Sequence, residues 1–291
     1  MSELYKIDKN TELGSVTLNV QQLDQMIAYY SRVIGLDVLN QSDQKADLGT
    51  KDNEKVLLTL IKEEAKGTPT RKTGLFHTAF LLPSRKDLGN VLYSYLSREI
   101  PIGGASDHGY SEALYLQDPE GNGIEIYADK PKEVWDVRPD GTIAGITIQM
   151  DANGVIESRD EGQKIDKFPA GTIIGHVHLS VSSLDATHEF YVDVLGLDLK
   201  YNYGEQAKFL AAGDYHHHIG ANTWAGENLP KREEIDLGLR SYSFVLPNEK
   251  ALNKVKENFE KLDMQYTEEV SGAISVYDPN GVKVFLEVAS N

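Results

Sequence analysis

The sequence contains no cysteine in 291 residues. This absence excludes disulfide bonds, cysteine nucleophiles and thiolate metal ligands together, so any metal must be bound by His, Asp or Glu. The sequence also has no uninterrupted apolar run of about 18 residues and no charged leader followed by an apolar stretch. We therefore expect no membrane-spanning helix, no secretory signal and a cytoplasmic location.

Positive charge is scarce as well. The chain has 29 Lys and Arg residues against 45 Asp and Glu residues, which gives a net charge of −16. So acidic a surface repels phosphate backbones and anionic lipids, and we expect no nucleic-acid partner and no membrane partner. With 40% apolar and 25% charged residues, the composition is typical of a globular protein, and the length suffices for two domains.

The sequence repeats itself. Three segments of the first half recur in the second half in the same order: "LDQMIAYYSRVIGLDVL" as "LDATHEFYVDVLGLDL", "GLFHTAFLLP" as "GLRSYSFVLP", and "DPEGNGIEI" as "DPNGVKVFL". Recurrence in a fixed order indicates an internal duplication. We therefore divide the chain into 1–130, a connector at 131–171, and 172–291.

Each half contains two smaller units of one pattern. Alternating segments such as "GHVHLSV" predict a first strand, a helical stretch follows, and further strand-like segments complete the unit. The "DPEG" and "DPNG" segments predict tight turns between the last two strands of a unit. The sequence thus predicts an α+β fold of four βαβββ units.

This arrangement resembles the vicinal oxygen chelate superfamily, which includes glyoxalase I, bleomycin-resistance proteins and extradiol ring-cleaving dioxygenases. The segments "IGHVHLSV", "YHHHIGANTWAG" and "SEALYLQDPEGNGIEIYAD" are most similar to catechol 2,3-dioxygenase-like proteins with four units. The resemblance covers nearly the whole chain. It implies that the units pair into two cupped mixed β-sheets with helices outside, and that a divalent metal lies inside a cup. Because this superfamily hosts several activities, the function must be argued from the site.

The resemblance places metal ligands early in the first strand of a unit and in the last strand of a unit. In the second and third units these positions hold His77, Glu125 and His176, whereas the other units offer poor ligands at Ser15, Ser241 and Phe285. Two histidines and one carboxylate form the facial triad of non-haem Fe(II) sites.

The three candidate ligands meet only if the inner units pair with each other and the outer units do the same. Pairing within each half would separate them, so we adopt the inner pairing. An alternative site in the third and fourth units would combine His176, one of three consecutive histidines and Glu287.

The three consecutive histidines are His216, His217 and His218. "YHHHIG" is similar to the segment of extradiol dioxygenases that carries the acid–base histidine, and the resemblance assigns this role to His217. Histidine suits the role because its ordinary pKa lies near neutrality. If strand alternation turns His217 into the cup, His216 and His218 face away as packing or surface residues. The opposite parity stays open.

The resemblance also places a catalytic tyrosine at Tyr115, in the strand before the last turn. Its phenol could donate a hydrogen bond to a catechol oxygen, and the alternative is an ordinary strand tyrosine. His108 is expected to line the substrate pocket. His178 shares the strand face of His176 and is expected either to line the pocket or to contact the metal ligands from behind.

These residues favour a metal-dependent extradiol-type dioxygenase that cleaves a catechol-like aromatic diol. Fe(II) is the expected cofactor, with Mn(II) or another divalent metal as the alternative. The expected partners are a small aromatic substrate and dioxygen, and a homo-oligomer is left open. A glyoxalase-type lyase or isomerase would need a fourth protein ligand that the sequence does not obviously supply. A non-catalytic small-molecule binding protein of the same fold is the remaining alternative.

Overall fold

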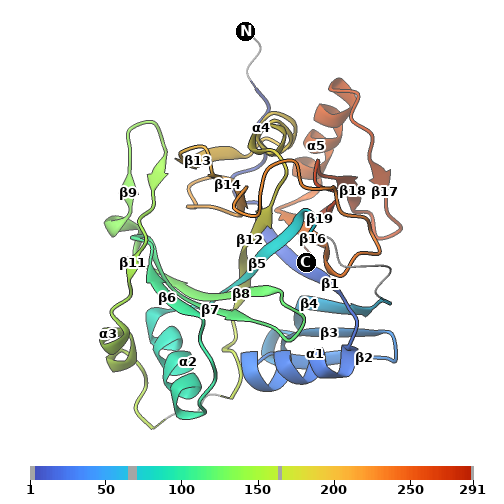
Figure 1. The fold of residues 1–291 in the computed structure, drawn as a ribbon. Helices are drawn as coiled ribbons and strands as arrows, with labels where there is room; N and C mark the ends of the chain where they lie inside the picture. The colour runs from blue at the N-terminus through green and yellow to red at the C-terminus, as the bar shows by residue number, and fades with distance from the viewer. Residues whose placement is uncertain (1–3, 65–70, 163–165, 290–291) are drawn as a thin grey trace.

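The computed structural model of the chain describes residues 4–64, 71–162 and 166–289. These residues form two large mixed β-sheets with helices on their outer faces (Figure 1). The predicted α+β fold with two cupped mixed sheets is confirmed. No helix within the described ranges is both long and apolar enough to cross a lipid bilayer.

The first and fourth units build an eight-stranded sheet, here called the outer sheet, in the order β17-β18-β19-β16-β1-β4-β3-β2. The first unit supplies β1 (Glu12–Val20), β2 (Asp37–Gln41), β3 (Lys45–Thr50), the short 3-10 turn η2 (Lys51–Asn53) and β4 (Lys55–Lys62). The fourth unit supplies β16 (Gly238–Leu246), β17 (Thr267–Glu268), β18 (Ile274–Tyr277) and β19 (Lys283–Val288). The two units meet at the antiparallel pair β1 and β16.

The second and third units build a nine-stranded sheet, here called the inner sheet, in the order β11-β6-β7-β8-β5-β12-β15-β14-β13. The second unit supplies β5 (Gly74–Leu81), β6 (Gly104–Asp107), β7 (Ser111–Gln117) and β8 (Gly123–Asp129). The third unit supplies β12 (Ile173–Ser180), β13 (Asp198–Tyr203), β14 (Ala207–Ala211) and β15 (Ile219–Asn222). The two units meet at the antiparallel pair β5 and β12, and β5 runs parallel to β8.

Each sheet therefore combines one unit from each half of the sequence. This topology confirms that inner units pair with inner units and outer units with outer units. The two repeated halves of the sequence each contribute to both sheets, so neither half forms a sheet by itself.

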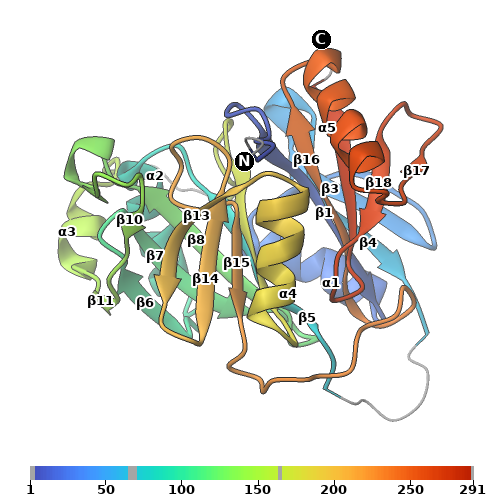
Figure 2. The same ribbon diagram turned by 90° about the horizontal axis from the view of Figure 1, so that it is seen from above.

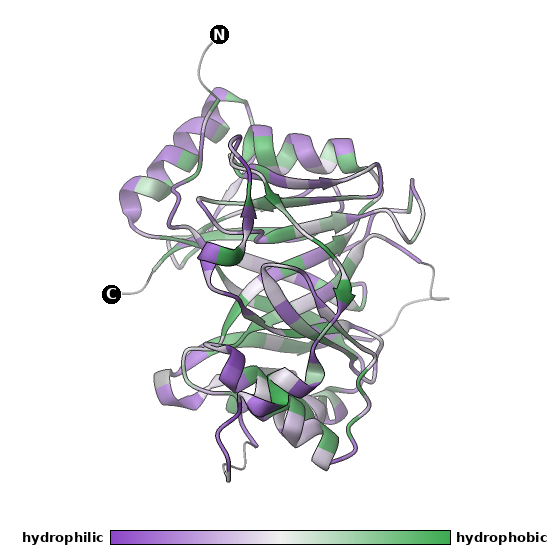
Figure 3. Cartoon of the chain, turned by 90° about the vertical axis from the view of Figure 1, so that its left-hand side faces the viewer, coloured by the Kyte–Doolittle hydropathy of each residue, from purple (hydrophilic) through white to green (hydrophobic). Residues whose placement is uncertain are grey.

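Helices cover one face of each sheet. In the first half, α1 (Leu23–Tyr29) continues into the π-helical turn η1 (Tyr30–Ile34), and α2 (Arg85–Ser97) packs on β8. In the second half, α4 (Leu184–His188) continues into the π-helical turn η4 (Glu189–Val194), and α5 (Glu249–Lys261) packs on β16 and β19 (Figure 2). Hydrophilic and hydrophobic residues alternate along the helices (Figure 3), and α5 buries Leu252, Val255 and Phe259 against the sheet.

One tyrosine in each half ties a helical segment to a turn of the following unit. The phenol of Tyr30 donates a 2.9 Å hydrogen bond to Oδ2 of Asp118, and the phenol of Tyr191 donates a 3.1 Å hydrogen bond to Oδ2 of Asp278. All four side chains are buried. Because Asp118 begins the turn that leads into β8, the first of these bonds helps to position the strand that carries Glu125.

The connector between the halves has structure of its own beside the inner sheet. It contains the 3-10 turn η3 (Lys132–Val134), the hairpin of β9 (Asp136–Val137) and β10 (Ile143–Ala144), then β11 (Ile148–Gln149) and α3 (Ala152–Glu157). β11 extends the inner sheet by pairing with β6, and α3 packs on α2. The connector therefore borders the open side of the inner cup.

Candidate metal centre

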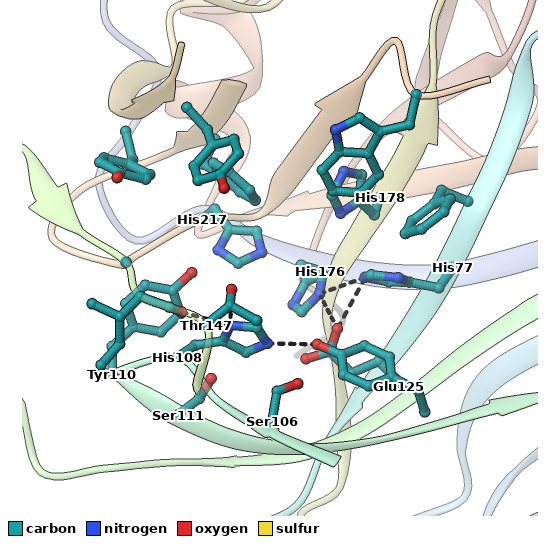
Figure 4. A pocket seen from close by; sticks show the side chains of 18 residues that line it. His77, Ser106, His108, Tyr110, Ser111, Glu125, Thr147, His176, His178 and His217 are labelled. Atoms are coloured by element: carbon teal, nitrogen blue, oxygen red, sulfur yellow. Dashed lines mark hydrogen bonds and ion pairs between the residues drawn. The ribbon is translucent and has the colours of Figure 1, made fainter. Parts of the chain in front are cut away.

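Three donor atoms converge on the inner face of the inner sheet (Figure 4). Nε2 of His77 lies 3.0 Å from Oε2 of Glu125 and 3.1 Å from Nε2 of His176, and the last two atoms are 3.2 Å apart. The three side chains are 6%, 3% and 2% exposed, in the order His77, Glu125 and His176. The structure therefore brings together the three candidate ligands that the resemblance assigned.

The strand register explains why they converge. Ala79 of β5 is the register partner of Glu125 on β8 and of His176 on β12, and His77 lies two residues before Ala79 on the same face. The methyl group of Ala79 leaves room for the longer side chains on both sides. Gly123, the register partner of His77, permits this close approach, because a Cβ there would lie 2.1 Å from the carbonyl oxygen of Phe76.

The donor set fits a divalent metal ion. Atoms bound to one ion at about 2.1 Å and at right angles to each other are separated by about 3.0 Å, close to the three observed distances. Burial alone raises the pKa of Glu125, but the neighbouring His176 and His77 outweigh it and hold that pKa well below the ordinary value. Burial lowers the pKa of His176 to about 4. An ionised carboxylate beside a neutral imidazole is the state that binds a metal.

A cavity of about 460 Å³ lies over the three donor atoms, within the usual range for small-molecule sites. Aromatic side chains are frequent in its wall: Phe76, Tyr110, Tyr115, Tyr201, Tyr203, Phe209 and Trp224. Among the described residues that line it, none is Lys or Arg, and Glu125 is the one acidic residue. The cavity therefore suits an uncharged, flat ring whose oxygen atoms face the donors.

The three consecutive histidines lie in the loop between β14 and β15, and not within a strand as expected. The chain turns at Gly213, whose φ of 59° is left-handed, and regains sheet hydrogen bonds only at His218, whose N–H donates to the carbonyl of Leu210 at 2.8 Å. The alternation of side chains nevertheless holds. His217 lines the cavity, whereas His216 and His218 do not.

His217 lies against the metal centre. Its ring centroid is 4.2 Å from that of His176 and 5.0 Å from that of Phe209. Burial and the neighbouring imidazoles lower the pKa of His217 well below 6.5, so the ring is neutral before a ligand binds. Its Nδ1 lies 2.7 Å from Nδ1 of His216. The geometry thus leaves Nε2 of His217 as the atom that can meet a ligand in the cavity.

His216 is buried and packed among aromatic rings, which is one of the two roles predicted for it, and it also makes a polar contact that was not predicted. Its ring stacks on Tyr110 with centroids 4.2 Å apart, and its Nε2 lies 2.9 Å from Oδ1 of Asp129. Asp129 was not singled out in the sequence. It lies four residues after Glu125 on the same strand and therefore on the same face. That spacing was the signal that could have identified it.

His218 points away from the metal centre. Its Nδ1 accepts a 3.2 Å hydrogen bond from the backbone N–H of Ala212, and its ring borders a separate cavity of about 340 Å³.

Tyr115 lines the cavity beside the candidate metal ligands. It is the register partner of Glu125, and its phenol oxygen lies 2.6 Å from Nε2 of His108. Burial and the nearby charge of Glu125 raise its pKa well above the ordinary value, so the phenol stays protonated. His108 also lines the cavity, as expected, and its Nδ1 lies 2.9 Å from the carbonyl oxygen of Ile146 in the connector.

His178 completes the wall next to His77. The two residues are register partners on β12 and β5, with ring centroids 4.9 Å apart, and His178 also contacts Phe76 and Trp224. Gly220 makes space for this ring, because a Cβ there would lie 2.8 Å from it.

The alternative site is not assembled. Glu287 lies on β19 in the outer sheet, next to Gly14 and Ser243, whereas His176 lies in the inner sheet. Ser15 and Ser241 likewise belong to outer-sheet strands. The one group of potential metal ligands among the described residues is His77, Glu125 and His176.

Comparison with known proteins agrees with this fold. The sequence profile of the Glyoxalase/Bleomycin resistance protein/Dioxygenase superfamily matches residues 12–126 and 173–286. The chain is 42% identical over 276 residues to catechol-2,3-dioxygenase of Bacillus subtilis (strain 168), which covers 94% of this chain and 95% of that protein. It is 31% identical over 127 residues to biphenyl-2,3-diol 1,2-dioxygenase 3 of Rhodococcus globerulus, which covers 40% of this chain and 63% of that protein. Glyoxalase I from Zea mays shares the fold, with a TM-score of 0.56 and 16% identity over 95% of this chain and 92% of that one. The chain therefore belongs to the glyoxalase/bleomycin resistance protein/dioxygenase superfamily.

Proposed function

We propose that this chain is an extradiol-type dioxygenase that cleaves a catechol-like diol, with His77, Glu125 and His176 holding a divalent metal. The observation that carries the proposal is the buried triangle of donor atoms, 3.0 to 3.2 Å apart, at the base of an aromatic cavity. Three protein ligands leave other coordination positions free for small molecules. The 42% identity to a catechol-2,3-dioxygenase over nearly the whole chain also supports the proposed extradiol-type dioxygenase activity.

Fe(II) is the cofactor that we propose, and Mn(II) is the alternative, because a His/His/Glu set discriminates weakly between the two. When bound, the metal supplies a template and a charge sink for the diol and dioxygen. Within this chain, we propose that His217 accepts a proton from a catechol hydroxyl. Tyr115, which also lines the cavity, is the proposed hydrogen-bond partner of the diol.

The cavity wall supports a further restriction on the substrate. Phe76 and Trp224 lie at the cavity with ring centroids 5.1 Å apart and are each about half exposed. An apolar ring substituent would cover this exposed surface. A carboxylate substituent would find no Lys or Arg among the described lining residues, and an unpaired charge in such a site is costly. We therefore propose catechols with uncharged substituents as substrates.

The other proposed activities receive less support. A glyoxalase-type lyase or isomerase would require a second carboxylate ligand, and the described residues offer Glu125 alone in the donor group.

We also propose a cytoplasmic location, from the absence of cysteine in the sequence.

The deciding experiment is anaerobic loading of the tag-free chain with Fe(II), followed by addition of catechol and dioxygen. We expect uptake of one dioxygen per catechol and formation of a ring-opened product whose broken bond lies next to the diol. A loaded chain that binds metal but consumes no dioxygen with any simple catechol would contradict the proposal. Loading with Zn(II) provides the control, because Zn(II) has no redox chemistry.

A further inference from the structure

A chain of hydrogen bonds leads from His217 away from the cavity. Nδ1 of His217 lies 2.7 Å from Nδ1 of His216, and Nε2 of His216 lies 2.9 Å from Oδ1 of Asp129. The His216 side chain is fully buried, whereas the Asp129 side chain is 23% exposed. These hydrogen bonds therefore connect the cavity wall to a carboxylate near the surface.

The Asp129 carboxylate, at the end of this series of hydrogen bonds, determines which ring nitrogens of His216 and His217 carry hydrogen. An ionised carboxylate can only accept, so Nε2 of His216 carries a hydrogen. A neutral His216 then has its lone pair at Nδ1, which accepts the hydrogen on Nδ1 of His217. A neutral His217 with its hydrogen on Nδ1 has its lone pair at Nε2.

Aromatic rings hold His216 in the orientation that its hydrogen bonds to His217 and Asp129 require. Tyr110 stacks on the His216 ring with 14° between the ring planes. The ring centroids of Tyr215 and Trp135 lie 4.1 Å and 5.3 Å from that of His216, and the Trp135 contact is edge-on. These three residues come from three separate segments: Tyr110 directly precedes β7, Trp135 belongs to the connector, and Tyr215 lies in the loop between β14 and β15. A ring packed in this way has one orientation, which preorganises its hydrogen bonds.

We propose that Asp129 and His216 are positioning residues that hold His217 in the tautomer whose Nε2 can accept a proton. The inference rests on the proposed function, in which His217 is the base. When a catechol hydroxyl transfers its proton, the O–H bond breaks and a bond from hydrogen to Nε2 of His217 forms. The resulting imidazolium keeps its Nδ1–H bond to His216. The carboxylate of Asp129 stabilises the positive charge through His216, as the acid of a catalytic triad does.

The tautomer can be measured without any turnover. The full chain, loaded with diamagnetic Zn(II) and labelled with 15N-histidine, is studied by long-range 1H–15N correlation, with His217→Gln identifying the His217 signals. We expect the Nδ1–H form of His217 in the unmodified chain. In Asp129→Asn, the side-chain amide can donate to Nε2 of His216, so we expect the Nε2–H form of His217 to appear. An Nε2–H form of His217 in the unmodified chain, or a tautomer that does not respond to Asp129→Asn, would overturn the proposal.

Kinetics of the Fe(II)-loaded chain give an independent test. We expect Asp129→Asn and His216→Gln each to lower kcat by about 10- to 100-fold, the usual cost of losing an outer-shell partner, with KM for catechol and metal content nearly unchanged. Because Asp129 acts only through His217, the double variant Asp129→Asn/His217→Gln should lose no more than His217→Gln alone. Additive losses in the double variant would contradict the proposal.

Two matched controls accompany these variants. Asp47→Asn removes a comparably shielded carboxylate in the outer sheet, where Asp47 accepts a 2.8 Å hydrogen bond from Thr59. His218→Gln changes the neighbouring histidine that points away from the cavity. Both should keep the kcat of the unmodified chain, and a loss in either as large as in Asp129→Asn would overturn the assignment. If the unmodified chain cleaves no catechol, the proposed function fails, whereas the tautomer measurement still decides the role of Asp129 and His216.

Discussion

The phenol oxygen of Tyr115 lies 2.6 Å from Nε2 of His108. Because Nδ1 of His108 lies 2.9 Å from the carbonyl oxygen of Ile146, a neutral His108 carries its hydrogen on Nδ1 and accepts the phenol hydrogen at Nε2. Donation from Tyr115 to a catechol oxygen therefore requires that the phenol turns away from His108. The connector, through Ile146, thus influences a hydrogen bond inside the cavity.

Tyr115→Phe is expected to lower kcat/KM for catechol by about tenfold or more, the scale of a hydrogen bond to a charged partner. His108→Phe keeps an aromatic ring but cannot accept the phenol hydrogen, so it should cost less than Tyr115→Phe. Steady-state rates at saturating dioxygen provide the measurement. Full activity in Tyr115→Phe would show that this residue is an ordinary strand tyrosine.

Single substitutions of the candidate ligands test the metal centre. His77→Ala, Glu125→Ala and His176→Ala should each weaken metal binding by more than about 100-fold, since even outer-shell partners contribute up to that amount. Elemental analysis after dialysis and a binding titration measure the effect. Ser241→Ala and Glu287→Ala are the outer-sheet controls and should retain metal. Loss of metal in Glu287→Ala alone would contradict the inner-sheet site.

His217→Gln tests the proposed base. We expect metal content to stay at the level of the unmodified chain and kcat for ring cleavage to fall by about 100-fold or more, the usual scale for removing a general base. Catechol binding measured without dioxygen should survive the change. If His217→Gln releases the metal instead, His217 is a ligand and the proposed division of roles is wrong.

Metal removal should affect the two sheets unequally. A bound ion stabilises only the state in which His77, Glu125 and His176 are assembled, so chelation should lower hydrogen-exchange protection in β5, β8 and β12 more than in β1 and β16. Exchange with and without a chelator, followed by mass spectrometry of peptides, measures the difference. Equal loss of protection in both sheets would show that they open as one cooperative unit.

Matched pairs of substrates test the proposed preference for catechols with uncharged ring substituents. We expect kcat/KM for 4-methylcatechol to exceed that for 3,4-dihydroxybenzoate by about 100-fold or more, because the carboxylate would be buried without a partner. Thr147 lines the cavity and is exposed, so Thr147→Arg should narrow this ratio, whereas Thr147→Gln should not. Equal rates for the two substrates in the unmodified chain would contradict the restriction to uncharged rings.

Sequence alone was sufficient for the features that depend on local pattern. The repeated segments indicated four βαβββ units, and the resemblance to the vicinal oxygen chelate superfamily assigned the ligand positions to His77, Glu125 and His176. Both signals lie in short segments of the sequence, because a strand alternates with a period of two residues whatever lies beyond it. The division at 1–130, 131–171 and 172–291 rests on the same kind of pattern and stays a prediction.

Tertiary structure decided which strands and side chains meet. The pairing of β5 with β12 joins segments almost one hundred residues apart in the sequence, and such pairing depends on how the two sheets bury their apolar faces together. The turn at Gly213 keeps the histidine row out of a strand, so no strand register in the sequence relates His216 to Asp129. Its bond to Asp129 links residues from different units, and the bond between His108 and Ile146 depends on the course of the connector. Hydrogen bonds between distant segments form only after packing has brought those segments together, so the spacing along β8 could mark Asp129 as a candidate, but only the tertiary structure paired it with His216.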